Sequence, residues 1–349
     1  MKTMKAARLF APGDLRLMEV PVPELRPHDV LCRVVRSGIC GTDHAIYTGE
    51  SSFVKSGAVK FPMTPGHEWS GTVAEVGADV TRFRSGNRVV GDTGVSCGEC
   101  TECLLGSYYN CSRSQAVGTI NAWDGAFAEY IVMPDRHLFP LPEGVSFDAG
   151  ALVEPAATAL YTVVRAEVRM GDTVLVHGTG PIGLLAAKFA KLSGAARVIS
   201  VGRREFKLKL AQAFGADSAV NLSGAALADF LRSGAAPDGI DRIIEASGSL
   251  DLLAQSLDLV KPGGTISTVA FYDRPVPAFD IDRLVAAGIT LRGVAGSLGM
   301  YPPVLKLMAT GTLDVEPLIT ARYPFDDILA ALGSLGGNPE RRVKVILEH

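Results

Sequence analysis

The chain has 349 residues, 47% of them hydrophobic and 20% charged, with a formal net charge of −3. This length is more than one ordinary domain needs and predicts two. The weak charge gives no general attraction to nucleic acid or to an anionic membrane, so we expect neither as a partner. We find no secretory signal, and the most apolar long stretch, 184–201, contains three basic residues, so we expect a cytoplasmic protein.

The first 142 residues predict a domain of short strands. In residues 30–35 and 71–77, apolar side chains alternate with polar ones or follow one another, and Gly and Pro bound these segments. This pattern is typical of strands. The frequent interruptions favour an irregular, mostly antiparallel β domain.

From about residue 149 the pattern changes to alternating helices and apolar strands. Strands are expected at 172–177, 197–201, 218–220, 242–245 and 265–270, and helices at 156–168, 182–193, 205–214, 225–232 and 250–259. Such alternation predicts a parallel, doubly wound sheet. The tail from about 288, with a helix at 302–310, should complete this sheet and return to the first domain. The predicted fold class is therefore α/β, with one domain formed by 1–148 and 289–349 and the other by 149–288.

Four of the six cysteines lie within fifteen residues, in a C-x-x-C-x-x-C-x7-C array. Zinc in structural sites prefers four thiolates in a closed tetrahedron, and this spacing lets one loop wrap the ion. Disulfides are the alternative, and so is a zinc ribbon for nucleic acid, although the loop carries little basic charge. The predicted structural zinc ligands are Cys97, Cys100, Cys103 and Cys111.

A second set of metal-ligand types is spread over three segments. These are Cys40-Gly-Thr42-Asp43-His44, Gly66-His67-Glu68, and Val153-Glu154-Pro155. Each segment alone is a weak signal, because a lone Cys or His is more often packing or surface. Together, and in this order ahead of a nucleotide-binding motif, they are much more specific.

Over essentially the whole chain these motifs resemble the zinc-containing medium-chain dehydrogenase/reductase family of alcohol and polyol dehydrogenases. The resemblance implies a GroES-like β catalytic domain beside a Rossmann cofactor domain. It also implies a catalytic zinc bound by Cys40 and His67, with Glu68 and Glu154 as candidates for the third ligand. Glu154 matches a cysteine of liver-type enzymes that is an acid in sorbitol-like, threonine-like and some secondary-alcohol branches. A carboxylate there suits substrates that chelate through neighbouring hydroxyls.

The resemblance also suggests roles around the zinc. Thr42 matches the hydroxyl that accepts the alcohol proton, and Asp43 matches the carboxylate that orients His67. His44 departs from the pattern, because the relay histidine of many relatives falls at the place held here by Ala45. His44 either serves from a shifted position or is an exposed loop residue.

A glycine motif follows the strand at 172–177 and opens a helix. Gly178-Thr-Gly180-Pro181-Ile182-Gly183 has the Gly-x-Gly-x-x-Gly spacing that brings backbone and a helix N-terminus to a pyrophosphate. About 20 residues on, where NAD enzymes place an acid, stands Gly202, followed by Arg203 and Arg204. Glycine leaves room for a 2′-phosphate and the arginines can clamp it, so we predict NADP(H); the alternative is that both arginines are solvated. By resemblance, further cofactor contacts are expected from Ala246, Ala295 and Lys344.

The predicted activity is zinc-dependent oxidation of a secondary alcohol or polyol to a ketone, or the reverse. A threonine-dehydrogenase-like activity is close behind, and a non-catalytic NADPH- and zinc-binding protein is the alternative of another class. The only expected partner besides the alcohol or ketone is another copy of the chain, since relatives form dimers or tetramers through a strand such as 291–295.

Overall fold

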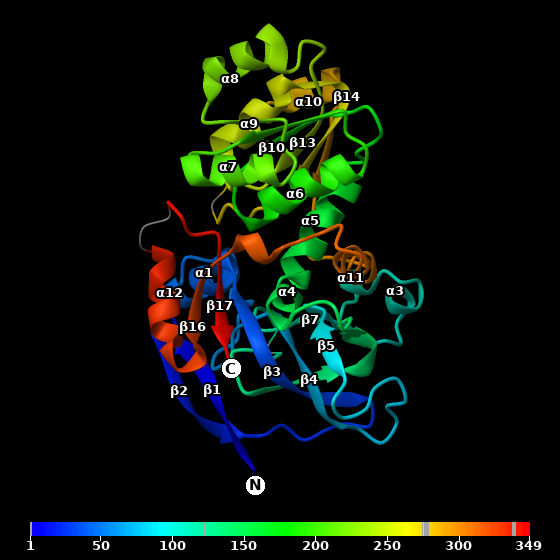
Figure 1. Ribbon diagram of the computed structural model, residues 1–349, viewed down its shortest axis with the longest axis vertical. Coiled ribbons are helices and arrows are strands. Elements are labelled where there is room, and N and C mark those ends of the chain that lie inside the picture. Colours follow the sequence, from blue (N-terminus) through cyan, green and yellow to red (C-terminus); the bar gives the residue numbers. More distant parts are fainter. Residues whose placement is uncertain (1, 122, 274, 276–278, 337–339) are drawn as a thin grey trace. The chain divides into compact units, whose positions relative to one another are not determined.

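The computed structural model describes residues 2–121, 123–273, 275, 279–336 and 340–349 (Figure 1). The chain forms two compact units, one of Met1–Ala157 with Gly296–His349 and the other of Thr158–Ala295. The first unit is thus discontinuous, and the boundaries expected at 149 and 289 lie nine and seven residues before the starts of the corresponding segments, Thr158 and Gly296.

Unit 1 is built on a mostly antiparallel sheet in the order β16-β17-β3-β4-β5-β9, with β8 paired to β3. A β1-β2 hairpin and a short β6-β7 pair complete it. This confirms the predicted irregular β domain. The strands are β1 (Thr3–Ala11), β2 (Asp14–Pro21), β3 (Asp29–Ile39), β4 (Glu68–Val76), β5 (Arg88–Gly91), β6 (Gly94–Val95), β7 (Gln115–Ala116), β8 (Tyr130–Pro134), β9 (Leu138–Pro140), β16 (Ile319–Pro324) and β17 (Lys344–Glu348).

Short helices connect these strands. The helices that begin in unit 1 are α1 (Gly41–Thr48), α2 (Ser52–Lys55), α3 (Thr101–Leu104), α4 (Phe147–Ala151), α5 (Val153–Arg165), α11 (Tyr301–Ala309) and α12 (Ile328–Gly336), with single 3-10 turns η1 (Tyr108–Asn110), η2 (Asp135–His137), η4 (Glu316–Leu318) and η5 (Phe325–Asp327). Helix α12 was not predicted. Its residues Ile328, Ala331 and Leu332 are buried in one core cluster with Leu9 and Ile46.

Unit 2 is a six-stranded parallel sheet in the order β12-β11-β10-β13-β14-β15. The chain runs outward from β10 to β12, then restarts beside β10 at β13 and runs outward the other way. Right-handed crossovers therefore place helices on both faces, and the order reverses between β10 and β13. The doubly wound sheet is confirmed. Its strands are β10 (Thr173–His177), β11 (Arg197–Val201), β12 (Ser218–Val220), β13 (Ile240–Glu245), β14 (Val260–Thr268) and β15 (Thr290–Gly293), and its helices are α6 (Pro181–Leu192), α7 (Glu205–Ala213), α8 (Gly224–Phe230), a π-helical turn η3 (Leu231–Ala235), α9 (Leu250–Leu259) and α10 (Ile281–Ala286).

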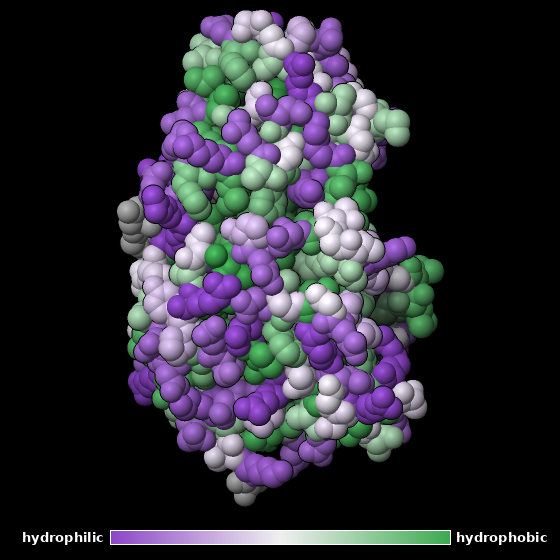
Figure 2. Space-filling view, viewed as in Figure 1, coloured by the Kyte–Doolittle hydropathy of each residue, from purple (hydrophilic) through white to green (hydrophobic). Residues whose placement is uncertain are grey.

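The visible surface is mainly hydrophilic (Figure 2). One hydrophobic spot lies over α3, where Leu104 is 75% exposed and Leu105 is 74% exposed. None of the helices formed by the described residues has the length and apolar character needed to cross a membrane.

Candidate functional site

Cys40, His67 and Glu68 come together in unit 1, with their ligand atoms within 4.8 Å of one another. Cys40 directly follows β3 and is the N-cap of α1, while Glu68 begins β4. The antiparallel pairing of β3 with β4 aligns Gly38 with Glu68 and so brings the two segments together. Gly38 leaves room for the Glu68 carboxylate, because a Cβ on it would lie 2.1 Å from Glu68 Oε2 and would displace that side chain.

Asp43 lies beside His67. Its Oδ1 is 3.4 Å from His67 Nδ1 and its Oδ2 accepts the Cys40 backbone N–H at 2.8 Å. Burial lowers the pKa of His67, but the charges of Asp43 and Cys40 outweigh burial and hold the pKa well above its usual value. The Asp43 carboxylate therefore lies next to Nδ1, and its expected role in orienting His67 toward a metal stays a prediction.

Lys344, at the start of β17, forms a buried ion pair with Glu68. Its Nζ lies 2.6 and 2.8 Å from the two carboxylate oxygens, and Lys344 and Glu68 are 3% and 1% exposed. Burial lowers the pKa of Lys344, but the nearby charges, with Glu68 first, raise it above its usual value. The pairing of β17 with β3 directs this ammonium to Glu68, and the expected contact of Lys344 with cofactor phosphates stays a prediction.

Glu154 stands in the first turn of α5, where its Oε1 accepts a hydrogen bond from the Thr93 hydroxyl at 3.2 Å. Its charge, like that of Cys40, raises the pKa of Lys344, but the group of ligand atoms within 4.8 Å of one another comprises Cys40, His67 and Glu68 without Glu154. Thr42 and His44 are half-buried on α1 next to this centre in sequence, and their catalytic roles stay predictions.

Cysteine sulfur, imidazole nitrogen and carboxylate oxygen are the ligand types of catalytic zinc. Cys40, His67 and Glu68 supply one of each within the reach of a single ion. The described side chains therefore fit a catalytic zinc, with Glu154 as a further carboxylate.

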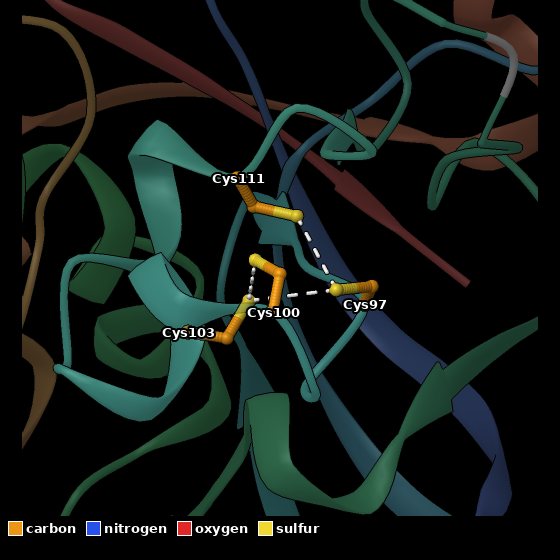
Figure 3. Close-up of side chains that lie close together, drawn as sticks. All are labelled: Cys97, Cys100, Cys103 and Cys111. Atoms are coloured by element: carbon orange, nitrogen blue, oxygen red, sulfur yellow. Dashed lines mark hydrogen bonds between the residues drawn. The ribbon is translucent and has the colours of Figure 1, made fainter.

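The four predicted structural ligands form a second cluster (Figure 3). Three sulfur–sulfur distances are 3.4, 3.6 and 3.8 Å, near the ~3.8 Å edge of a tetrahedron with Zn–S bonds of about 2.3 Å. All four cysteines are free thiols, so the disulfide alternative is wrong. The Glu99 backbone N–H lowers the pKa of Cys97 to about 6, which favours the thiolate that zinc requires.

The glycine motif of unit 2 joins β10 to α6. A Cβ on Gly178 would lie 2.8 Å from the Ala246 carbonyl oxygen, and one on Gly183 would lie 2.0 Å from the Gly178 oxygen, so both are packing glycines. Gly180, the N-cap of α6, instead borders open space, and Pro181 begins the helix. An open glycine at a helix N-terminus is the cradle that a pyrophosphate needs.

The second part of the predicted cofactor site follows β11. Gly202 is buried, Arg203 is exposed and Arg204 is the N-cap of α7. A Cβ on Gly202 would lie 2.3 Å from Thr179 Oγ1, so Thr179 fills the space beside this glycine. Ile182 and Ala246 are half-buried and Ala295 is exposed at the end of unit 2, and their cofactor contacts stay predictions.

Comparison with known proteins identifies the family of the chain. Residues 26–143 match the alcohol dehydrogenase GroES-like domain, and residues 181–310 match the zinc-binding dehydrogenase domain. L-threonine 3-dehydrogenase of Symbiobacterium thermophilum is 32% identical over 99% of this chain and 98% of its own, and several relatives at 31–36% identity carry the same name. The chain belongs to the zinc-containing medium-chain dehydrogenase/reductase family.

Two similar solved structures bear on the cofactor. A zinc-binding dehydrogenase from Sinorhizobium meliloti 1021 bound to NADP is 32% identical, with a TM-score of 0.87 and full coverage of both chains. An Escherichia coli CFT073 alcohol dehydrogenase (rspB) complexed with NADH is 29% identical, with a TM-score of 0.90 over 99% of each chain. Structures of this likeness therefore carry either cofactor.

Sequence reasoning missed two residues of this dehydrogenase's zinc region. Thr93 follows β5 with no motif around it, and Lys344 was expected elsewhere. A buried glutamate needs a nearby cation, so burial of Glu68 would have indicated a basic partner. The sequence alone does not say which residue supplies that positive charge.

Proposed function

We propose that this dehydrogenase oxidises a secondary alcohol with a polar substituent on the neighbouring carbon, using NADP⁺ and giving a ketone, or runs the reverse reduction. The observation that supports this most is the cluster of Cys40, His67 and Glu68, with Glu154 rather than a thiolate as the additional ligand type. A carboxylate-rich centre favours substrates that offer two oxygens, or an oxygen and a nitrogen.

The side chains divide the work. A bound zinc supplies Lewis acidity that lowers the pKa of the alcohol hydroxyl. Thr42, on α1, would accept the proton of the alcohol hydroxyl while passing its own proton on toward the cofactor ribose, and Asp43 would hold the His67 ring in place. Lys344 neutralises Glu68 behind the centre, so this carboxylate does not add an unbalanced charge to it.

For the cofactor we propose a preference for NADP(H). Gly202 offers no acid to hold the ribose hydroxyls, and exposed Arg203 is available for a 2′-phosphate. The NADP-bound Sinorhizobium relative supports this choice, while the NADH-bound relative makes the measurement necessary. The preference is wrong if NAD⁺ gives a higher kcat/KM than NADP⁺.

Diols and sugar alcohols are the first substrate candidates. L-Threonine is the second, favoured by the name of the curated relatives, and it also carries a polar group next to its secondary hydroxyl. A panel of vicinal diols, sugar alcohols, simple secondary alcohols and L-threonine, followed by NADPH absorbance, separates these classes. No turnover with any of them, together with tight NADPH binding, would favour the non-catalytic alternative.

We also propose a homodimer or homotetramer in the cytoplasm. β15 is the edge strand of the unit 2 sheet, and extension of that sheet across a two-fold axis would pair it with a second copy. Light scattering on the purified protein tests the assembly, and a monomer would contradict it.

A further inference from the structure

The buried carboxylate of Asp92 binds two tyrosines of the four-cysteine loop. Asp92, directly after β5, is 1% exposed. Its Oδ2 accepts the Tyr108 hydroxyl at 2.6 Å, and its Oδ1 accepts the Tyr109 hydroxyl at 2.7 Å. Both tyrosines belong to η1, between the zinc ligands Cys103 and Cys111. We call Asp92, Tyr108 and Tyr109 the tyrosine anchor.

The tyrosine anchor is next in sequence to Thr93, a residue that contacts Glu154 near the catalytic centre. Thr93, the residue after Asp92, donates its hydroxyl to Glu154. The backbone around it is fixed on both sides, because Asp92 N–H donates to the His137 carbonyl at 2.9 Å and the Thr93 carbonyl accepts from Val117 N–H at 2.8 Å. The Asp92 carboxylate and the Thr93 hydroxyl, which donates to Glu154, thus stand on neighbouring residues of one held backbone segment.

Tyr109 also holds the segment that re-enters unit 1. Its hydroxyl lies 3.1 Å from Ser297 Oγ and accepts the Ser297 backbone N–H at 3.3 Å. The ring touches two glycines: a Cβ on Gly296 would lie 2.6 Å from Tyr109 Cε1, and one on Gly94 would lie 2.8 Å from the same atom. Gly296 has a φ of +73°, so the turn here needs glycine for conformation as well as space.

An apolar contact would have anchored the loop at lower cost, because burying a carboxylate carries a desolvation penalty of several kcal/mol. Two hydroxyl donors offset this penalty and fix the position of the loop in two directions.

We propose that the tyrosine anchor makes the four-cysteine loop a positioning element of the catalytic centre, with Tyr109 and Asp92 setting Glu154 through Thr93 and setting the turn at Gly296–Ser297. This rests on the proposed function in that Glu154 serves the catalytic zinc. The loop then contributes to metal retention and turnover as well as to stability.

The test uses the zinc-loaded protein and variants that keep shape. Tyr109→Phe keeps the ring against both glycines and removes only the hydroxyl, Thr93→Val removes the donor to Glu154, and Leu104→Ser changes an exposed residue of the same loop as a control. Zinc per chain, the melting temperature, zinc release to a chelator, and kcat and KM are measured for each.

We expect Tyr109→Phe and Thr93→Val to keep two zinc ions per chain and the wild-type melting temperature within a few degrees. Zinc should leave the wild type in two phases, the faster from the cluster of Cys40, His67 and Glu68, because the four-thiolate site is closed. This faster phase should accelerate at least fivefold and kcat should fall at least tenfold, while Leu104→Ser matches the wild type in both. The double variant should release zinc no faster, and have a kcat no lower, than the more strongly affected of the two single variants, because both substitutions act on the same path.

The proposal is overturned if Tyr109→Phe leaves the faster release phase and kcat within twofold of the wild type. It is also overturned if activity falls only in proportion to loss of the four-thiolate zinc, since the loop would then matter for stability alone. Failure of the proposed function is seen separately, as a wild-type protein that oxidises none of the panel. The zinc-release measurement needs no substrate, so it still tests the tyrosine anchor in that case.

Discussion

Lys344 and Glu68 form a buried ion pair across 276 residues of chain, with Nζ 2.6 Å from Oε1. Both side chains are almost fully buried, so neither charge has water as an alternative partner. The pair couples the last strand of the chain to the Gly-His-Glu segment.

Lys344→Met should therefore destabilise unit 1 strongly. Removing one partner of a buried pair leaves an unpaired buried charge, which costs about 3–5 kcal/mol. Urea unfolding at pH 7.5 measures the loss. The double variant Glu68→Gln with Lys344→Met is the control and should recover most of it. If the single variant is as stable as the wild type, the pair contributes nothing to the fold.

Replacing Gly202 by Ala should destabilise unit 2, because the new Cβ would lie 2.3 Å from Oγ1 and 2.5 Å from Cγ2 of Thr179. Overpacking of this kind costs about 1–3 kcal/mol. Thr179→Ala removes both atoms and leaves a Cβ–Cβ approach of 3.0 Å, so it should relieve most of the cost in the double variant. Additive effects of the two substitutions on the melting temperature would contradict the contact.

The same contact predicts how the cofactor preference can be changed. Gly202→Asp alone should raise the Kd for NADPH at least tenfold without producing tight NADH binding, because Thr179 prevents the new carboxylate from taking its place. Gly202→Asp combined with Thr179→Ala should bind NADH more tightly than either single variant. Fluorescence titration with NADPH and NADH measures these Kd values. Tight NADH binding by Gly202→Asp alone would show that Thr179 moves aside and does not block the new carboxylate.

Cys40→Ser and Cys103→Ser should fail in different ways. Cys40 belongs to the catalytic cluster, so its loss should remove one zinc per chain and at least a hundredfold of kcat while the melting temperature changes little. Cys103 belongs to the closed four-thiolate loop, and its loss should lower the melting temperature first. Metal analysis and calorimetry on both variants measure the difference. A fully active Cys40→Ser protein would refute the catalytic assignment.

The local parts of this molecule were predictable and the long-range parts were not. The strands of unit 2 alternate with helices at a regular spacing and the zinc ligands stand in short motifs, so neighbouring residues were enough to find them. Glu68 was expected at the zinc, but its ion pair with Lys344 was not. That pair depends on the pairing of β17 with β3, which no local sequence pattern specifies. Helix α12 was missed because its short, Gly-containing sequence is stabilised mainly by packing against Leu9 and Ile46.

Buried histidines should make the protein sensitive to acid. Burial lowers the pKa of His137 to about 3 and that of His177 to about 4, against about 6.5 in the unfolded chain. The unfolded state therefore binds more protons below pH 6.5. The stability from these groups is complete above that pH and is lost as the pH falls toward 4 and 3, by about 1.4 kcal/mol per pH unit for each histidine.

His177→Leu isolates one of these contributions. Within the described part of the chain neither ring nitrogen of His177 has a hydrogen-bond partner, so leucine removes the titration without breaking a bond. Between pH 8 and pH 5 the variant should lose about 2 kcal/mol less unfolding free energy than the wild type. Carboxylates titrate alike in both proteins, so the difference between their urea-unfolding curves reports His177. Equal losses in the two proteins would mean that His177 is charged, or solvated, in the folded state.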